Sequence, residues 1–185
     1  MGAKMDELVL VRPAPAHKSS AEEFNREFFS CGEQVINGSA LLDKMEFGEW
    51  LEKVEKNRNP ETVSKDWVVA DTFFAVRKTD GRIIGTVDIR HNLDNEFLSK
   101  YGGHIGYAVR PSERRRGYAT QILKMALKHA KSIGLSSVML GCYSDNLASI
   151  RTIEKCGGVL AETKPYLDGR PMNVYWITLY NAENT

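Results

Sequence analysis

The sequence predicts an α/β domain of the layered α+β kind, with a mixed, mostly antiparallel sheet of six to seven strands flanked by about four helices. Two β-rich runs, 73–77 and 83–90, are joined by Thr79-Asp80-Gly81, which is typical of a hairpin. A long amphipathic helix pattern then stands between two strand patterns, which indicates a β-α-β crossover. A chain of 185 residues is long enough to bury one full core.

The first third of the chain predicts one strand and two helices. Leu8 to Val11 is a short apolar run ended by Pro13, so we expect it to be extended. A helix is expected to begin at Ser20, because Ser20 and Glu23 have the spacing of a capping box. A second amphipathic helix ends before Asn59-Pro60, and its apolar face consists of Phe47, Trp50, Leu51 and Val54.

The remaining elements are separated by turn residues. The 92–103 segment is expected to be a loop or short turn, and the last two strands turn at Asp168-Gly169,. The order predicted for the whole chain is β-α-α-β-β-β-α-β-α-β-β. Beyond the hairpin, the strands are expected at 104–110, 137–142, 158–164 and 172–180, and the helices at 119–133 and 146–155.

Composition and charge exclude several classes of protein. Lys plus Arg is 25 and Asp plus Glu is 24, a net charge of +1, which argues against a general nucleic-acid binder or a cationic membrane protein. No run of about 18 apolar residues predicts a membrane span, and the N-terminus lacks the apolar core of a secretory signal. The cysteines, Cys31, Cys142 and Cys156, form no pair that predicts a disulfide framework or a zinc site. We therefore expect a cytoplasmic protein with no metal.

The most informative segment is the basic turn before the long helix. Arg114, Gly117 and Ala119 follow a strand pattern and open the helix. The start of a helix offers unpaired N–H groups and a partial positive charge, which suit an anion such as a phosphate. Gly117 would let the backbone approach that anion closely. A solvated turn at an ordinary helix start is the alternative interpretation.

This segment resembles the acyl-CoA-binding motif Q/R-x-x-G-x-G/A of the GCN5-related N-acetyltransferase (GNAT) superfamily. Asn146-Leu147-Ala148-Ser149 and the later Glu154-Lys155-Cys156-Gly157 resemble the second signature of that family. The resemblance implies a GNAT-like sheet and one acetyltransferase domain over residues 1–185, with its core signature at 70–180. It also implies acetyl-CoA as the acyl donor.

The resemblance further implies a cofactor site made largely of backbone groups. Val109, Arg110 and Pro111 would pair with the pantetheine arm, and one N–H there would polarise the thioester carbonyl. Asn146 and Ser149 would contact the lower arm of the cofactor. The pyrophosphate would be held by Arg114, Arg115, Arg116, Gly117, Tyr118, Ala119 and Thr120.

The sequence offers several candidates for the catalytic acid and base. The position where many family members carry an acidic Tyr is Ile153 here, so Tyr143 is the candidate acid; water alone could also serve, because a thiolate is a good leaving group. His104 and Asp88 are the candidate bases, and the alternatives are a strand-end histidine bonded to the backbone and a solvated or loop-bracing aspartate. Tyr107 alternates with apolar strand residues, so we expect it in the core.

The resulting hypothesis is an N-acetyltransferase that moves an acetyl group from acetyl-CoA to a primary amine by direct attack in a ternary complex. The acceptor is a small-molecule amine or a peptide amine, and no nucleic-acid or membrane partner is expected. A monomer and a homodimer both remain open. One alternative is a non-catalytic acyl-CoA-binding sensor, favoured by Ile153; another is an anion- or RNA-binding domain that uses Arg114 to Arg116,.

Overall fold

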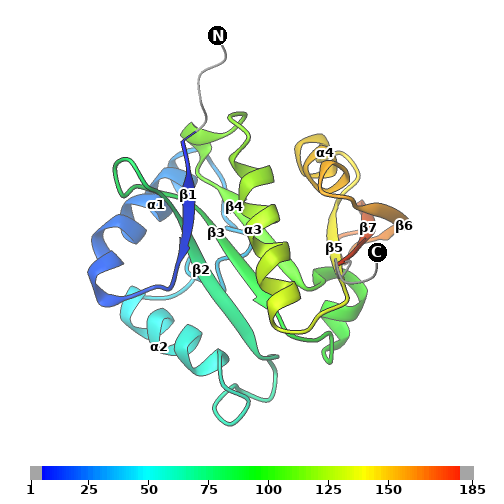
Figure 1. Cartoon of the computed structure of the whole chain (residues 1–185), viewed down its shortest axis with the longest axis horizontal. Coiled ribbons are helices and arrows are strands. Elements are labelled where there is room, and N and C mark those ends of the chain that lie inside the picture. The colour runs from blue at the N-terminus through cyan, green and yellow to red at the C-terminus, as the bar shows by residue number, and fades with distance from the viewer. Residues whose placement is uncertain (1–5, 180–185) are drawn as a thin grey trace, which may run out of the picture.

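The computed structural model describes residues 6–179. These residues form seven strands and four α-helices in the predicted order, which confirms the fold class (Figure 1). No helix in this range is long and apolar enough to cross a membrane. The strands are β1 (Leu8–Val11), β2 (Ala70–Arg77), β3 (Ile83–Arg90), β4 (Ile105–Val109), β5 (Ser137–Tyr143), β6 (Val159–Pro165) and β7 (Pro171–Thr178), and the helices are α1 (Lys18–Ser30), α2 (Phe47–Asn57), α3 (Tyr118–Ser132) and α4 (Leu147–Lys155).

The strands form two sheets, which part between β4 and β5. One sheet has the order β1-β2-β3-β4 and the other β5-β7-β6, and every pair within them is antiparallel. The two sheets meet where the N–H of His104 donates to the carbonyl oxygen of Met139 at 2.8 Å. Within the described sheet β4 pairs only with β3, so its other edge is free to face the space between the sheets.

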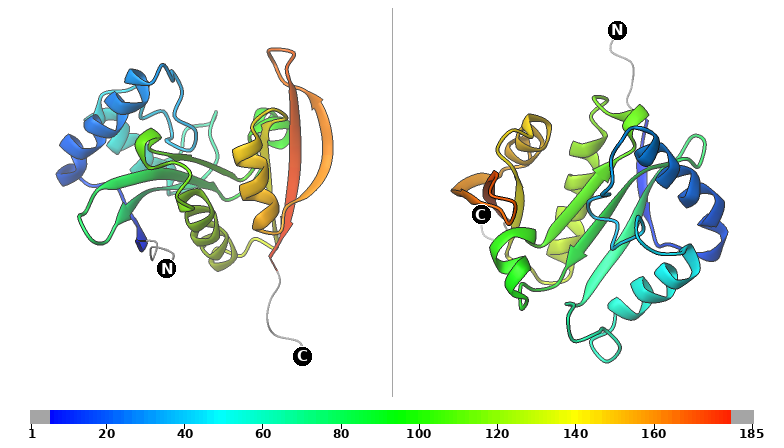
Figure 2. Two further views of the ribbon diagram at one scale, coloured as in Figure 1. Left: turned by 90° about the horizontal axis from the view of Figure 1, so that it is seen from above. Right: turned by 180° about the vertical axis from the view of Figure 1, so that it is seen from behind.

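Helices cover both faces of the four-stranded sheet. Figure 2 shows α1 and α2 on one face and α3 on the other. The first face buries Phe24, Phe28 and Trp50 against Phe74 of β2, and the second face buries one side of α3, including Ile122. Because both faces are covered, β2 and β3 are almost entirely buried, which explains their nearly continuous apolar sequence.

Several element boundaries differ from the sequence predictions by a few residues; β2, for example, begins at Ala70 rather than at residue 73. The capping box at Ser20 and Glu23 is wrong, because α1 already begins at Lys18, directly after a 3-10 turn at Pro15–His17. Pro15 suits the first position of that turn, and the ring Nδ1 of His17 accepts a hydrogen bond from the N–H of Ala14 at 3.0 Å. The 92–103 segment, expected as a loop or turn, contains a π-helical turn at Leu98–Gly102. The predicted end of the last strand, Tyr180, lies outside the described residues.

Two segments cross closely over β4 and β5 near the point where these strands separate, and a glycine makes room for each crossing. A side chain on Gly38, in the segment between α1 and α2, would collide with the backbone of Gly106 on β4. A side chain on Gly141 of β5 would collide with the carbonyl of Tyr101. Both crossings lie near the junction of β4 and β5, so they close one end of the space between the two sheets.

Candidate active site

A cleft of about 960 Å³ lies between the two sheets. Its walls come from β4 and the start of α3 on one side and from β5 and α4 on the other. Residues between α1 and α2 and the π-helical turn contribute to its rim. This volume suits an extended ligand of moderate size.

Most of the predicted cofactor residues line this cleft, together with the candidate acid Tyr143. Arg110, Pro111, Arg116, His104 and Asp88 are not among its lining residues. The predicted cofactor residues that do line it are Val109, Arg114, Arg115, Gly117, Tyr118, Ala119, Thr120, Asn146 and Ser149.

The start of α3 has the geometry of an anion site. Gly117 caps the helix with φ +83°, a left-handed conformation that favours glycine,. The N–H of Gln121 donates to the carbonyl of Gly117, so the amides of residues 118–120 lie in the first turn and have no acceptor within the helix. Because Gly117 and residues 118–120 line the cleft, these amides are unpaired donors suited to an anion there.

The side chain of Arg110 turns away from the cleft. It is only 1% exposed, and its Nε donates to the carbonyl of Ile83 at 2.7 Å. One guanidinium nitrogen donates to Glu23 at 3.0 Å and to Glu27 at 2.8 Å, both on α1. Burial opposes ionisation of Glu27, but hydrogen bonds from Ser112 and Arg110 outweigh it and lower the pKa. The Arg110 side chain therefore ties β4 to α1 and leaves only its backbone for a ligand.

The other arginines of the basic turn are also largely neutralised. Arg114 pairs with Glu33, and Arg116 pairs with Glu113 at 3.1 Å. The buried carboxylate of Glu113 also binds the guanidinium groups of Arg77 and Arg82. Within the part of the chain that the structure describes, Arg115 is the member of this turn whose side chain has no such partner. Of the arginines in this turn, Arg115 is therefore the one cation beside the cleft that has no acidic partner among the described residues.

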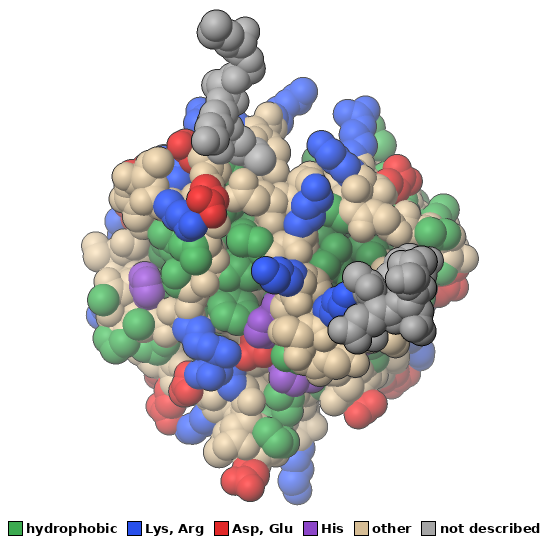
Figure 3. All heavy atoms as spheres, viewed as in Figure 1, with side chains coloured by type: hydrophobic (Ala, Val, Ile, Leu, Met, Phe, Trp, Pro, Cys, Tyr) green, Lys and Arg blue, Asp and Glu red, His purple; other side chains and the backbone are tan. Residues whose placement is uncertain are grey.

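Basic side chains gather near the cleft. On the face shown in Figure 3, several Lys and Arg side chains lie over the region of α3 and α4, and acidic side chains lie mainly toward the edges of this face. The backbone amides at the start of α3 therefore lie in a region that carries basic side chains as well.

His104 and Asp88 both have structural partners. His104 is 7% exposed, and its Nδ1 accepts from the N–H of Met139 at 2.9 Å. Burial and the charge of Arg90 lower its pKa. Asp88 accepts from the hydroxyl of Thr72 at 2.9 Å and pairs with Arg90 at 3.0 Å. The imidazole of His104 thus bonds the β5 backbone where the sheets part, and a catalytic role for either residue stays a prediction.

Tyr143 lines the cleft, and its hydroxyl proton is already used in a hydrogen bond. Its hydroxyl donates to the carboxylate of Asp168 at 2.8 Å, and burial together with that bond raises its pKa. Its ring also contacts Tyr166, which in turn contacts Tyr101, so aromatic side chains line this end of the cleft. Tyr143 as the acid stays a prediction.

Tyr107 is a cleft residue that the sequence reasoning assigned to the core. Its side chain faces the side of β4 that packs against α3, as the alternation predicted, but it also lines the cleft. Its hydroxyl lies 3.1 Å from the hydroxyl of Ser149 on α4. The side-chain period revealed which face of the strand Tyr107 occupies, but nothing local in the sequence showed that the sheet parts beside it.

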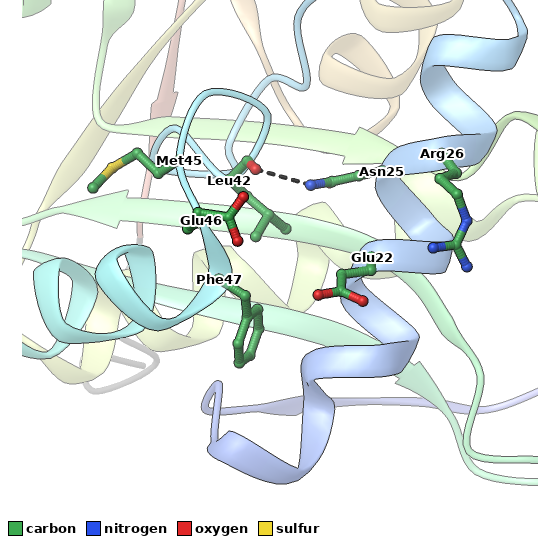
Figure 4. Close-up of a pocket in the computed structure, with 7 residues that line it drawn as sticks. All are labelled: Glu22, Asn25, Arg26, Leu42, Met45, Glu46 and Phe47. Carbon is green, nitrogen blue, oxygen red and sulfur yellow. Dashed lines mark hydrogen bonds between the residues drawn. The ribbon is translucent and has the colours of Figure 1, made fainter.

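A smaller pocket of about 270 Å³ lies apart from the cleft, between α1 and the turn into α2. Figure 4 shows Glu22 and Glu46 on opposite sides of it and the amide of Asn25 donating to the carbonyl of Leu42, at 2.8 Å. It shares no lining residue with the cleft. Its contacts anchor the segment that crosses β4 at Gly38. In residues 6–179 no group of three or more His, Cys, Asp or Glu could hold a metal ion.

The divided sheet and the amide-rich start of α3 are those of a GNAT-type acyltransferase fold. A family model described as "Acetyltransferase (GNAT) family" matches residues 38–158. The chain therefore belongs to the GNAT acetyltransferase family, which confirms the resemblance noted in the sequence and places the chain among acetyl-CoA-dependent acyltransferases.

Individual relatives agree with this membership. The chain is 30% identical over 91 residues to an uncharacterized N-acetyltransferase, YjdG, of Bacillus subtilis strain 168, a match covering 49% of this chain and 52% of that protein. The chain thus spans about half the length of this relative. The fold is similar to that of an acetyltransferase, yncA, of Salmonella typhimurium solved with acetyl-CoA (TM-score 0.67, 14% identity, 96% of each chain). It is also similar to a GNAT-family acetyltransferase of Streptococcus pneumoniae (TM-score 0.67, 16% identity, 94% and 100%).

Proposed function

We propose that this protein is an N-acetyltransferase that moves an acetyl group from acetyl-CoA to a primary amine by direct attack in a ternary complex. The observation that carries the proposal is a single cleft that begins at the free amides of α3 and ends where β4 and β5 meet. The start of α3 and the open edge of β4 line the same cleft, and an elongated thioester with a diphosphate needs both an anion site and a strand edge. We also propose that residues 1–185 form one acetyltransferase domain.

In this proposal the start of α3 holds the pyrophosphate. Residues 114–120 would contribute backbone N–H groups, Thr120 its hydroxyl, and Arg115 a guanidinium without an acidic partner among the described residues. The complex of yncA with acetyl-CoA supports a CoA thioester as the ligand.

The open edge of β4 would hold the pantetheine arm and the thioester. Val109 lines the cleft, and the chain from Val109 to Pro111 would pair with amide groups of the arm. Attack of the amine on the thioester places negative charge on the carbonyl oxygen. One oriented backbone N–H donor at that oxygen supplies about 3 kcal/mol of stabilisation, and holding amine and thioester together supplies the positional gain.

The acceptor amine would enter where the rim is aromatic. Phe97, Tyr101 and Tyr166 lie there in mutual ring contact, and an aromatic rim accommodates the apolar part of a small-molecule or peptide amine. The amine must lose a proton to attack. Because neither His104 nor Asp88 lines the cleft, a chain of water would take this proton or pass it to one of them,.

The test is amine-dependent release of free thiol from acetyl-CoA. Purified protein is incubated with acetyl-CoA and a panel of small-molecule amines and peptides with free amino groups. A chromogenic reagent that reacts with thiols then detects the CoA released. Thiol release above the amine-free and protein-free controls, with the acetylated amine found by mass spectrometry, is the expected result. An acetyl-CoA complex with no amine-dependent release across the panel would contradict the transferase proposal.

That second outcome would favour an acyl-CoA-binding sensor. The observation behind this alternative is Ile153, a 1% exposed residue of α4 at the position where many family members carry an acidic tyrosine. Under the sensor alternative, acetyl-CoA raises the unfolding temperature while the thiol assay stays at its background rate.

A further inference from the structure

The cleft contains a pair of hydroxyl groups that joins its two walls. Tyr107 on β4 and Ser149 on α4 both line the cleft, and their oxygens are 3.1 Å apart. Ser149 is fixed in the first turn of α4, because its backbone N–H donates to the side chain of Asn146 at 3.1 Å. The pair therefore has a defined place on each wall.

The strand order indicates where the leaving atom of the reaction, the sulfur of CoA, would lie relative to this pair. Val109 lies at the α3 end of β4, and the closed end of the cleft lies at Gly106. Tyr107 stands between them, two residues or about 7 Å from Val109 along the strand. A thioester that runs from the α3 amides along β4 passes this position before it reaches the junction of the sheets.

The direction of the hydrogen bond follows from the chemistry of the two hydroxyls. A phenol is a stronger acid than an aliphatic alcohol, so Tyr107 is the better donor and Ser149 the better acceptor. Burial raises the pKa of Tyr107 to about 12, so the phenol keeps its proton at neutral pH. When Tyr107 donates to Ser149, the proton of Ser149 can point at the thiol of Cys142, which interacts with Ser149 on the same wall, or at an acceptor atom of a ligand in the cleft.

We propose that the Tyr107–Ser149 pair donates a hydrogen bond to the departing sulfur of CoA, with Ser149 in contact with the sulfur and Tyr107 orienting Ser149. This inference rests on the proposed acetyl transfer. The amine nitrogen forms a bond to the acetyl carbon, the carbon–sulfur bond breaks, and its electron pair stays on sulfur. The proton lost by the amine goes to a base or to water, and the thiolate takes a proton from water after release.

Stabilisation of the thiolate, rather than protonation, is the step that this pair can perform. A thiol has an ordinary pKa of about 8.5, so transfer of a proton from the more weakly acidic Tyr107 would be unfavourable. A hydrogen bond to the developing charge needs no such transfer. The pair would also take the place of the phenol that many family members carry at the α4 position occupied here by Ile153.

The test compares CoA with desulfo-CoA, which lacks only the sulfur. The affinity of wild type, Tyr107→Phe and Ser149→Ala for both ligands is measured by calorimetry between about pH 6 and pH 9.5. The matched control is Tyr175→Phe, which removes a buried phenol bonded to Glu154 of α4 but outside the cleft lining.

In wild type the affinity for CoA should rise with pH as the thiol ionises, while the affinity for desulfo-CoA stays flat. Tyr107→Phe and Ser149→Ala should each lose about ten times more affinity for CoA than for desulfo-CoA at the high pH, as expected for a hydrogen bond to a charged group. Tyr175→Phe should keep both affinities.

Equal losses for CoA and desulfo-CoA, or no loss for either, would overturn the proposal and leave acetyl transfer standing. Failure of wild type to bind acetyl-CoA would instead overturn the proposed function and this inference with it. Because each variant is compared with itself on two ligands, a variant that folds less well still gives the ratio that decides the question.

Discussion

The two walls of the cleft differ in what they offer a ligand and in what holds them in place. The wall of β4 and α3 offers backbone groups, and buried ion pairs below it bind Arg110 to Glu27 and Glu113 to Arg77. The wall of β5 and α4 offers side chains, including Tyr143, Ser149 and Cys142. Burial raises the pKa of Cys142, so this thiol stays protonated at neutral pH.

This difference indicates a division of tasks between the walls. Backbone amides at a helix start bind an anion without depending on any one side chain. Hydroxyl groups can orient a hydrogen bond toward an atom whose charge changes during reaction. Arg110, which the sequence predicts as a cofactor residue, instead uses its side chain to stabilise the first wall from beneath, and substitutions can separate these tasks.

The largest effect should come from breaking the ion pairs beneath the first wall. Arg110→Ala leaves Glu27 and Glu23 without their buried partner, and we expect the free energy of unfolding to fall by about 3 kcal/mol. Denaturant unfolding measures this loss. The control is Arg116→Ala, an exposed arginine whose loss should change stability by about 0.5 kcal/mol or less,. A stable Arg110→Ala variant with lost acetyl-CoA affinity would instead make Arg110 a ligand side chain.

A second stability effect should come from a cluster outside both walls. Asp71 accepts hydrogen bonds from His91 and His129 at 2.9 Å each and from Arg12 at 3.1 Å. Burial opposes ionisation of Asp71, but these bonds outweigh it and lower its pKa to about 2. Asp71→Asn should therefore cost about 2 kcal/mol of stability near neutral pH without changing acetyl-CoA affinity.

The pH dependence of that loss has a definite sign. A carboxylate with a lowered folded-state pKa contributes stability that is present above its ordinary pKa and is lost as the pH falls through the folded value. The difference in unfolding free energy between wild type and Asp71→Asn should thus shrink as the pH falls from about 5 toward about 2. A difference that stays constant over this range would show that the charge of Asp71 is not what stabilises the cluster.

Gly117→Val should weaken the binding of acetyl-CoA by the wall of β4 and α3. Gly117 has φ +83°, which a β-branched residue adopts only with strain,. We expect at least a tenfold loss, or about 1.4 kcal/mol, in acetyl-CoA affinity by calorimetry. Gly134→Val is the matched control, because Gly134 has φ +92° just after α3 and does not line the cleft. Equal affinities of the two variants for acetyl-CoA would show that the α3 amides do not bind this ligand.

The smallest effect should come from the one arginine of the turn that has no acidic partner among the described residues. Arg115→Ala should weaken acetyl-CoA binding about threefold and reduce its salt dependence, since a single exposed cation contributes under about 1 kcal/mol. Arg116→Ala, whose guanidinium pairs with Glu113, should change the affinity less. A larger loss for Arg116→Ala than for Arg115→Ala would contradict the assignment of the free cation.

Local sequence patterns predicted what depends on neighbouring residues. The element order was predictable because hydrophobic periods and turn residues act over a few positions, and the start of α3 could be assigned because Gly117 and its amides lie in one short segment. The boundary of α1 was not predictable from the Ser20–Glu23 spacing, because the turn at Pro15–His17 already directs the chain into the helix.

The features of the site that the sequence did not predict depend on contacts between residues far apart in the chain. Arg110 pairs with Glu27, 83 positions away, so its removal from the anion site could not be inferred from the basic turn. Tyr107 faces the cleft only because β5 leaves β4 beyond Met139 and brings Ser149 to it, 42 positions along the chain. Whether two strands separate depends on the other strands with which they pair, so the sequence of either strand alone does not predict the separation.

The most direct test of the cleft as a CoA site is thermal unfolding of the wild-type protein with acetyl-CoA and, separately, with ATP at the same concentration. A ligand bound only by the folded state stabilises it by about 2.7 kcal/mol at a hundredfold excess over Kd. We expect a clear rise in Tm with acetyl-CoA and little change with ATP. No rise with millimolar acetyl-CoA would contradict the assignment of the cleft and of the α3 amides as an acetyl-CoA site.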